Sequence, residues 1–326
     1  STTDFIQSII MSVALIVVLI FGVETAGGIG AVIHNDSELP GYLSMTLSYD
    51  VNTGKAAPYS ALTIVSTAAW GLGYFGMPHI LLRFMAIEDE KKLKLSRRVA
   101  TIWVVISLFV AVFIGVIGYT MSKVGALEML TGSNSETIIV KISALLSQHG
   151  VIFALLAGVI LAGILASTMS TSDSQLLAAS SAVSSDILGA FRKDSSNKNG
   201  SMAAARITLL VISVVAAFIA RNPDSSVFAI VSFAWPGFGA AFGPVVLFSL
   251  FWKRTSKWGA LAGMVCGGSM VFIWKYLIRP LGGIWNIYEL LPAFLIACAA
   301  IVIVSLLTPK PSKEIEEEFD RVAQMK

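Results

Sequence analysis

Long apolar runs are the feature that most limits what this chain can fold into. An α-helix needs about 20 consecutive apolar residues to cross roughly 30 Å of hydrocarbon. Runs of about this length or longer span residues 5–32, 59–86, 99–122, 151–189, 203–221, 226–252, 258–278 and 288–307. A shorter amphipathic stretch covers residues 136–147. We therefore predict an all-α integral membrane protein with eight spans.

Composition supports a membrane protein. The 326 residues are 56% hydrophobic and only 13% charged, which is too few charges for the surface of a soluble chain of this length. The net charge of +3 gives no indication of a nucleic-acid partner. Cys266 and Cys298 both lie in apolar runs and cannot form a disulfide framework. Because residues 1–32 lack the features of a signal peptide, we expect the chain to start within a longer protein.

The positions of Lys and Arg predict the orientation of the bundle. With residues 1–4 inside, the inner segments 83–98, 192–206, 253–257 and 308–326 hold 17 of the 23 basic residues, and the outer segments hold 6. Cytoplasmic loops of membrane proteins carry such an excess. Both ends of the chain are therefore predicted inside the cell, with residues 33–58 as an extracellular loop. The acidic tail is predicted as a short soluble helix or a disordered end.

The stretch 163–177 concentrates hydroxyl groups within one predicted span. Six Ser or Thr residues and Asp173 fall within positions 167–174. At 100° per residue, Ser167, Thr171 and Ser174 share one helical face, with Ser170 beside it. Oxygen-rich faces of this kind suit a small hard cation such as Na⁺. Hydrogen bonding between helices is the alternative, but the density of hydroxyls around Asp173 favours a cation.

Two further stretches combine aromatic residues with helix breakers. In residues 70–83, the residues Trp70, Tyr74 and Pro78 recur every four positions, and three glycines interrupt the run. This pattern predicts a broken span whose aromatic face lines a substrate site, with a kinked packing helix as the alternative. Residues 233–244 are rich in glycine and alanine, which favours close helix packing over ligand contact.

At these residues the chain resembles the sodium/solute symporter family, above all its proline-transporting members. The resemblance runs from end to end and rests on Thr3 to Gln7, Trp70 to Met85, Met169 to Leu177, Phe233 to Phe248 and Gly259 to Met264. It implies a thirteen-helix fold built on two inverted five-helix repeats, of which this chain would hold the last eight helices. It thus implies that most of the first repeat is missing.

The resemblance also divides the chain into segments. Residues 1–32 would be the last helix of the first repeat, and residues 59–252 would be the second repeat. Residues 253–307 would be two peripheral helices and residues 308–326 a cytoplasmic tail. The missing N-terminal helices and the lipid bilayer would be the partners of this chain.

Site residues are implied in the same way. The sodium ligands would be the Ser170 and Thr171 hydroxyls and the Ser167 carbonyl. A second sodium could lie between Asp4, Asp173 and Ser174, although an ordinary interfacial role is the alternative for Asp4. The resemblance places substrate beside Trp70, Tyr74 and Pro78.

Secondary transport is the function that these observations predict. The hypothesis is Na⁺-coupled uptake of L-proline by alternating access, with no organic cofactor and no catalysis. Pantothenate, a sugar or another carboxylate is an alternative solute. A transporter-like sensory module is the alternative function. An intramembrane enzyme would need a paired nucleophile and base or a metal cluster, and the sequence offers neither.

Overall fold

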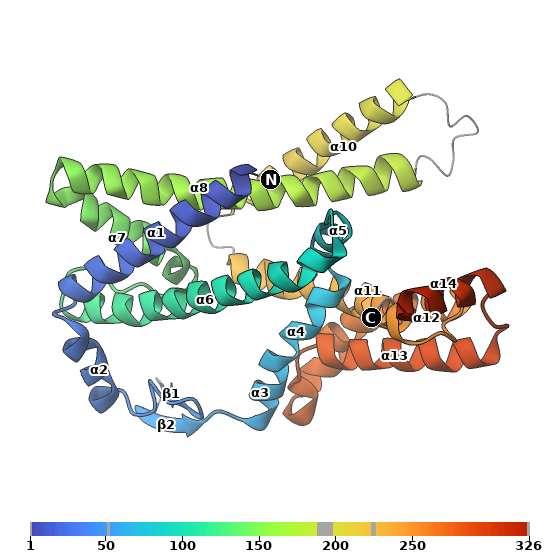
Figure 1. Ribbon diagram of the computed structural model, residues 1–326. Coiled ribbons are helices and arrows are strands. Elements are labelled where there is room, and N and C mark those ends of the chain that lie inside the picture. The colour runs from blue at the N-terminus through green and yellow to red at the C-terminus, as the bar shows by residue number, and fades with distance from the viewer. Residues whose placement is uncertain (1, 51–52, 188–197, 223–225, 325–326) are drawn as a thin grey trace. The chain divides into compact units, whose positions relative to one another are not determined.

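The structure is a computed structural model that describes residues 2–50, 53–187, 198–222 and 226–324 (Figure 1). It divides into two compact units. The first comprises Ser1–Tyr42 with Ile87–Val227, and the second comprises Leu43–Ala86 with Phe228–Lys326. Each unit therefore combines segments that are distant in the sequence. Both draw on the predicted second repeat, so that repeat stays a prediction.

The first unit is a group of helices around an aliphatic core. Its main helices are α1 (Thr2–Thr25), α2 (Ile29–Glu38), α6 (Leu93–Lys123), α7 (Ile138–Leu146), α8 (Val151–Ser181) and α10 (Lys198–Ile219). A π-helical turn, Ala182–Ile187, extends α8. Helix α1 packs against both α6 and α8 (Figure 1). The largest buried side chains are Val18, Ile114, Ile117, Met121, Ile142 and Leu146.

Helix α1 runs antiparallel to α8. Near its end, the ring of Phe21 lies 5.2 Å from that of His149, just before α8 begins. Nearer its start, Ile10 contacts Gly163, twelve residues into α8. The helices stay close because a Cβ at Gly163 would lie only 3.2 Å from Ile10. The beginning of α1 therefore points along α8 toward the hydroxyl-rich segment.

The first predicted span, residues 5–32, is wrong as a single helix. Helix α1 ends at Thr25, and α2 begins at Ile29. Between them, Gly27 and Gly28 have φ values of 90° and 92°, which only glycine adopts readily. These two residues turn the chain sharply, so part of the predicted extracellular loop is the helix α2.

The second unit contains a hairpin and a broken helix. Strands β1 (Leu47–Asp50) and β2 (Lys55–Pro58) pair antiparallel, with Leu47 opposite Pro58. The predicted span 59–86 follows as α3 (Ala61–Ala68), α4 (Trp70–Gly73), the 3₁₀ turn Tyr74–Gly76 and α5 (Pro78–Met85). The interruption lies where the glycines and Pro78 predicted it, because Met77 has an extended backbone with ψ of 111°.

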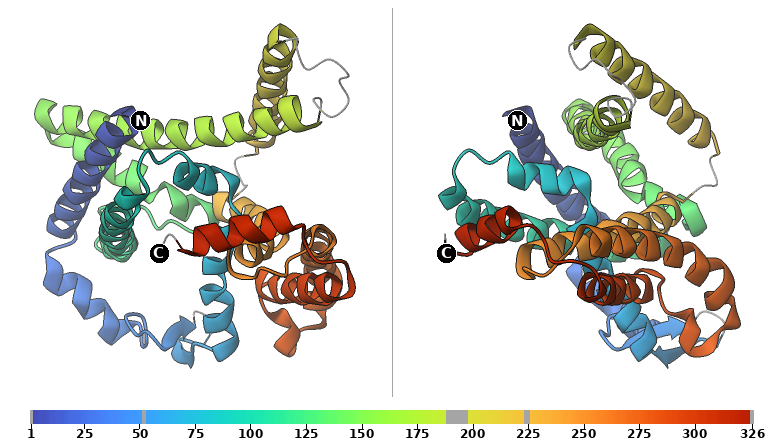
Figure 2. Two further views of the ribbon diagram at one scale, coloured as in Figure 1. Left: turned by 45° about the vertical axis from the view of Figure 1, so that its right-hand side comes forward. Right: turned by 90° about the vertical axis from the view of Figure 1, so that its right-hand side faces the viewer.

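Long helices complete the second unit. They are α11 (Val227–Phe251, of which all but Val227 belongs here), α12 (Lys257–Ile273) and α13 (Leu290–Leu307), followed by the short tail helix α14 (Lys313–Gln324). Figures 1 and 2 show α12 and α13 side by side. Lys253 forms an ion pair with Asp320 that ties α14 to the loop after α11. The tail is thus the helix that the sequence offered as one alternative.

Helices of the described segments confirm a multi-pass membrane protein. Seven of them are long and apolar enough to cross a membrane: Phe5–Thr25, Leu93–Lys123, Val151–Ser184, Met202–Ile219, Val227–Phe251, Lys257–Leu281 and Leu290–Leu307. The eighth predicted span is the broken one. The hairpin β1–β2 is the only sheet in the part of the chain that the structure describes. The predicted helical class is therefore confirmed.

Glycine allows close packing of α12 against its neighbours. A Cβ on Gly267 would overlap the carbonyl oxygen of Ala240 in α11 and would lie 3.0 Å from Ala297 in α13. The adjacent Gly268 has room, since its Cβ would meet Ala241 at an ordinary 3.8 Å. The two neighbouring glycines therefore form a matched pair for testing this contact.

We expect Gly267→Ala to destabilise the protein by about 1–3 kcal/mol, because backbone atoms must move to admit the methyl group. The measurement is the melting temperature of the purified protein in detergent. Gly268→Ala is the control and should melt close to the wild type. Equal melting temperatures for the two variants would contradict the packing described here.

Candidate functional site: an aromatic cluster on a broken helix and a hydroxyl array on α8

Trp70 lies at the centre of an aromatic cluster in the second unit. Its ring stacks with Phe228 at 5.5 Å and with Tyr288 at 5.4 Å, the latter with planes only 4° apart. Trp235 lies 6.1 Å away. Offset aromatic pairs of this kind contribute about 0.5–1.5 kcal/mol each beyond their buried area. We call Trp70, Phe228, Trp235 and Tyr288 the Trp70 cluster.

The broken helix is held against α11 by direct backbone contact. The indole Nε1 of Trp235 donates a hydrogen bond of 3.0 Å to the Trp70 carbonyl. A Cβ on Gly73 would overlap the Trp235 ring, and one on Gly239 would lie 2.7 Å from the Cα of Gly73. These contacts confirm that the small residues of 233–244 serve close packing. The Trp235 bond joins α11 to the first residue of α4, seven positions before the extended Met77.

Tyr74 and Pro78 are exposed, whereas Trp70 is partly buried. The Tyr74 ring makes an edge-on contact of 4.9 Å with Trp235 and is 57% exposed, so it remains accessible. Pro78 is also exposed, but it starts α5 beyond the extended Met77. Although Trp70, Tyr74 and Pro78 recur every four positions, Pro78 does not continue the helical face of the other two, because the predicted break lies before it.

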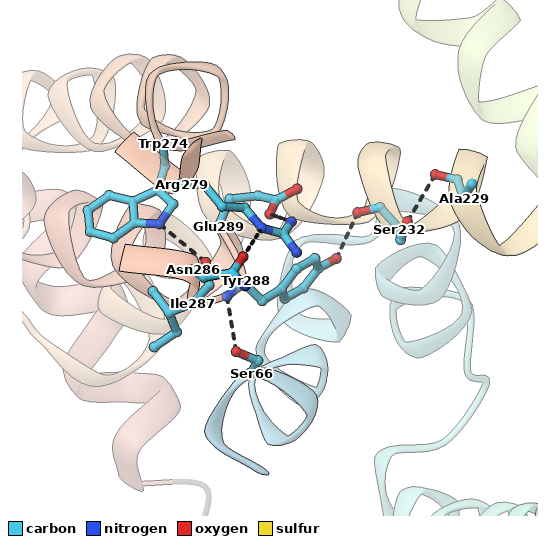
Figure 3. A network of polar contacts seen from close by, with 9 residues as sticks. All are labelled: Ser66, Ala229, Ser232, Trp274, Arg279, Asn286, Ile287, Tyr288 and Glu289. Atoms are coloured by element: carbon cyan, nitrogen blue, oxygen red, sulfur yellow. Dashed lines mark hydrogen bonds and ion pairs between the residues drawn. The ribbon is translucent and has the colours of Figure 1, made fainter. Parts of the chain in front are cut away.

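A polar network adjoins the cluster (Figure 3). Its centre is Glu289, whose side chain is only 1% exposed and accepts a hydrogen bond of 2.9 Å from Arg279 Nη1. The Nε of Arg279 donates to Asn286 Oδ1 at 3.1 Å. Trp274 Nε1 donates to the Ile287 carbonyl at 3.2 Å. These bonds order the short connection between α12 and α13.

A cavity of about 220 Å³ opens between the cluster and this network. Its lining residues are Ser66, Thr67, Trp70, Phe228, Ser232, Lys275, Arg279, Tyr288 and Glu289, all from the second unit. Aromatic rings form one part of the wall and charged groups of both signs form another. The cavity thus adjoins Trp70 on the side of Tyr288, and neither Tyr74 nor Pro78 lines it.

The hydroxyl array lies on α8 in the first unit. The Thr171 hydroxyl donates to the Ser167 carbonyl at 3.2 Å, and the Ser174 hydroxyl donates to the Ser170 carbonyl at 3.1 Å. The Ser167 carbonyl oxygen and Thr171 Oγ1, two of the sodium ligands that the resemblance implies, are thus neighbours. Na⁺ is similar in size to Ca²⁺, whose oxygen ligands lie at about 2.3–2.6 Å. One ion could therefore contact both oxygens.

Asp173 and Asp4, the acids of the possible second sodium site, lie on different helices. The Asp173 side chain is exposed on α8. Asp4 lies in the first turns of α1, in the direction that leads along α8 toward Ser170. One turn after Asp4, the enclosed Gln7 Oε1 has no hydrogen-bond partner in the described segments. No cluster of three His, Cys, Asp or Glu side chains able to hold a metal occurs within those segments.

Several residues of the site escaped the sequence analysis. Trp235 belonged to a stretch interpreted as packing, and Arg279 was only one of the six basic residues in the predicted outer segments. Glu289, at the start of the last apolar run, was the one available indication, since an acid at that depth needs a partner. Nothing in the sequence connects Tyr288 with Trp70, which is more than 200 positions away.

Removing the guanidinium group of Arg279 should destabilise the protein, because it leaves the buried Glu289 carboxylate without its cation. Arg279→Met is expected to cost about 1–3 kcal/mol, measured as a lower melting temperature in detergent. Lys275→Met is the control, since Lys275 lines the same cavity but lies over the Phe233 ring at 3.8 Å. Equal effects of the two changes would show that the ion pair contributes nothing.

Comparison with known proteins identifies the relatives of this chain. The model of the sodium:solute symporter family matches residues 1–267. The osmoregulated proline transporter OpuE of Bacillus subtilis is 37% identical over 96% of this chain. The sodium/proline symporters of Salmonella typhimurium and Escherichia coli are 37% and 35% identical, each over 98%. The chain spans 60% of the length of each of these relatives.

A solved structure confirms the predicted symporter fold. It is a substrate-bound, outward-open Na⁺-coupled sialic acid symporter, with a TM-score of 0.63. The match covers 95% of this chain and 62% of that one, at 18% identity, and so concerns the fold alone. The family match rests on the sequence itself and includes both the broken helix and the hydroxyl array. The chain therefore belongs to the sodium:solute symporter family, a family of membrane transporters, as its sequence predicted.

Proposed function

We propose that the protein takes up L-proline together with Na⁺ across the cell membrane by alternating access. The observation that carries the proposal is the adjacent pair of oxygens, Ser167 O and Thr171 Oγ1, on a helix of a sodium symporter family member. The relatives' names support proline as the solute. Coupling would be reciprocal, so that bound Na⁺ tightens proline binding and bound proline tightens Na⁺ binding.

The sodium ion would bind on α8 in this proposal. Its ligands would be the carbonyl of Ser167 and the hydroxyls of Ser170 and Thr171. The Thr171 hydroxyl now donates to the Ser167 carbonyl. When the cation binds, this bond would break and the hydroxyl hydrogen would rotate away from the ion. A second ion between Asp4, Asp173 and Ser174 is proposed on the antiparallel course of α1 along α8, which leads Asp4 toward that segment.

Proline would bind at the exposed aromatic side of the broken helix. Trp70, Tyr74 and Pro78 are the proposed contacts. Support comes from the accessible Tyr74 ring, which contacts Trp235 of the Trp70 cluster. The aromatic faces would cover the pyrrolidine ring.

The proposed orientation places the C-terminus in the cytoplasm. The excess of Lys and Arg in the segments 83–98, 192–206, 253–257 and 308–326 supports it. In that orientation, the connection between α12 and α13 lies on the outer side, together with the cavity beside Trp70.

Uptake of radiolabelled L-proline by the intact protein in cells or vesicles tests the function. We expect an outward-to-inward Na⁺ gradient to drive accumulation, whereas K⁺ should not. Excess unlabelled L-proline should compete, and pantothenate, sugars and other carboxylates should not. Accumulation that is equal in Na⁺ and K⁺ would contradict sodium coupling. Competition by another solute, but not by unlabelled L-proline, would identify that solute as the substrate in place of proline.

The double variant Ser170→Ala with Thr171→Ala should lose sodium-stimulated proline uptake, since it removes two of three proposed ligands. We expect the Na⁺ concentration for half-maximal uptake to rise at least about tenfold, which corresponds to about 1.4 kcal/mol. Ser172→Ala, an exposed hydroxyl on the same turn, is the control. Unchanged sodium dependence in the double variant would show that the sodium site does not use these hydroxyls of α8.

A further inference from the structure

Tyr288 connects the α12–α13 connection to the broken helix. It directly precedes the buried Glu289 and the start of α13. Its own ring is buried, with an exposed fraction of 7%. Of the contacts that Trp70 makes, the one with Tyr288 is the most nearly parallel, with an angle of 4° between the planes. The ring of Tyr288 therefore covers part of the Trp70 indole.

Hydrogen bonds fix Tyr288 at both ends. Its backbone N–H donates to Ser66 Oγ in α3 at 3.1 Å, and its hydroxyl donates to the Ser232 carbonyl in α11 at 2.9 Å (Figure 3). The first bond joins it to the helix immediately before the break. The second joins it to the helix on which the broken segment packs. A ring held at both ends in this way has little freedom to move.

The adjacent ion pair restrains the same connection. Glu289 follows Tyr288 directly and is held by Arg279, which also binds Asn286. The chain from Arg279 to Glu289 is therefore closed on itself by side-chain bonds. These bonds therefore add to the support that Ser66 and Ser232 give Tyr288.

We propose that Tyr288 is a positioning residue for solute binding, which acts by holding the Trp70 indole in the orientation that contacts the solute. This inference rests on the proposed function, in which Trp70 touches proline. Tyr288 itself makes no proposed contact with the solute at the exposed side of the helix, where Tyr74 lies. Its loss would free the indole, and binding would then have to restrict it again.

Uptake of L-proline by the intact protein, measured at saturating Na⁺ and normalised to the amount in the membrane, tests the proposal. Tyr288→Ala should raise KM about three- to tenfold, because one stacked partner is lost, while the maximal rate changes little. Tyr288→Phe keeps the ring but loses the bond to Ser232, and should raise KM less than Tyr288→Ala. Tyr276→Ala removes an exposed ring of the same unit that is absent from the Trp70 cluster, and serves as the control.

A double-mutant cycle separates positioning from a general structural effect. Trp70→Leu alone should raise KM, and adding Tyr288→Ala should then change KM by less than about twofold, since Tyr288 would have no indole left to hold. If Tyr288→Ala does not reach the membrane, Ser66→Ala replaces it in the cycle. That variant loses only the acceptor of the Tyr288 N–H and should raise KM in the same direction.

The outcomes distinguish this inference from the proposed function. If Trp70→Leu raises KM but Tyr288→Ala and Ser66→Ala do not, the positioning role is wrong and the substrate site stands. Additive increases of KM in the double variant would also overturn the positioning role. If Trp70→Leu leaves proline uptake unchanged, Trp70 is not part of the substrate site and both proposals fail.

Discussion

The contact between the broken helix and α11 is the constraint on which the second unit depends. Small residues let two membrane helices approach until their backbones touch. Here Trp235 donates to the carbonyl of Trp70, and the Gly73–Gly239 approach brings the two backbones together without side chains between them. The aromatic cluster, the cavity and the ordered connection before α13 are all arranged around that contact.

The two candidate features differ in how they use the backbone. On α8 the helix stays regular, and its side-chain hydroxyls return to carbonyls one turn earlier, which places oxygens in pairs. In the broken helix, the chain leaves the helical conformation at Met77 and resumes it at Pro78, and aromatic rings pack around Trp70 and Tyr74 before the break. The first arrangement offers oxygen to a cation, and the second offers an apolar surface beside polar backbone. A coupled transporter needs both chemistries.

Much of the fold could be predicted from the sequence, because long apolar runs have few alternatives to spanning helices. The break near Pro78 was predicted from its glycines and proline. The division of residues 5–32 into two helices was not, since Gly27 and Gly28 look like ordinary small residues until their positive φ values are known. The hydroxyl face of α8 was read from spacing alone. The Arg279–Glu289 pair could not be predicted, because it depends on how the chain turns between α12 and α13. The Tyr288–Trp70 stack could not be predicted either, because it joins segments that are distant in the sequence.

The packing of Gly73 on Trp235 also limits which substitutions these two positions can accept. No methyl group fits at position 73 while an indole occupies position 235. A smaller residue at 235 would admit it, but it would also remove the donor to the Trp70 carbonyl. The two positions are therefore free to vary only as a pair, and each intermediate in that exchange either has a steric clash or lacks the side-chain bond that joins α11 to α4.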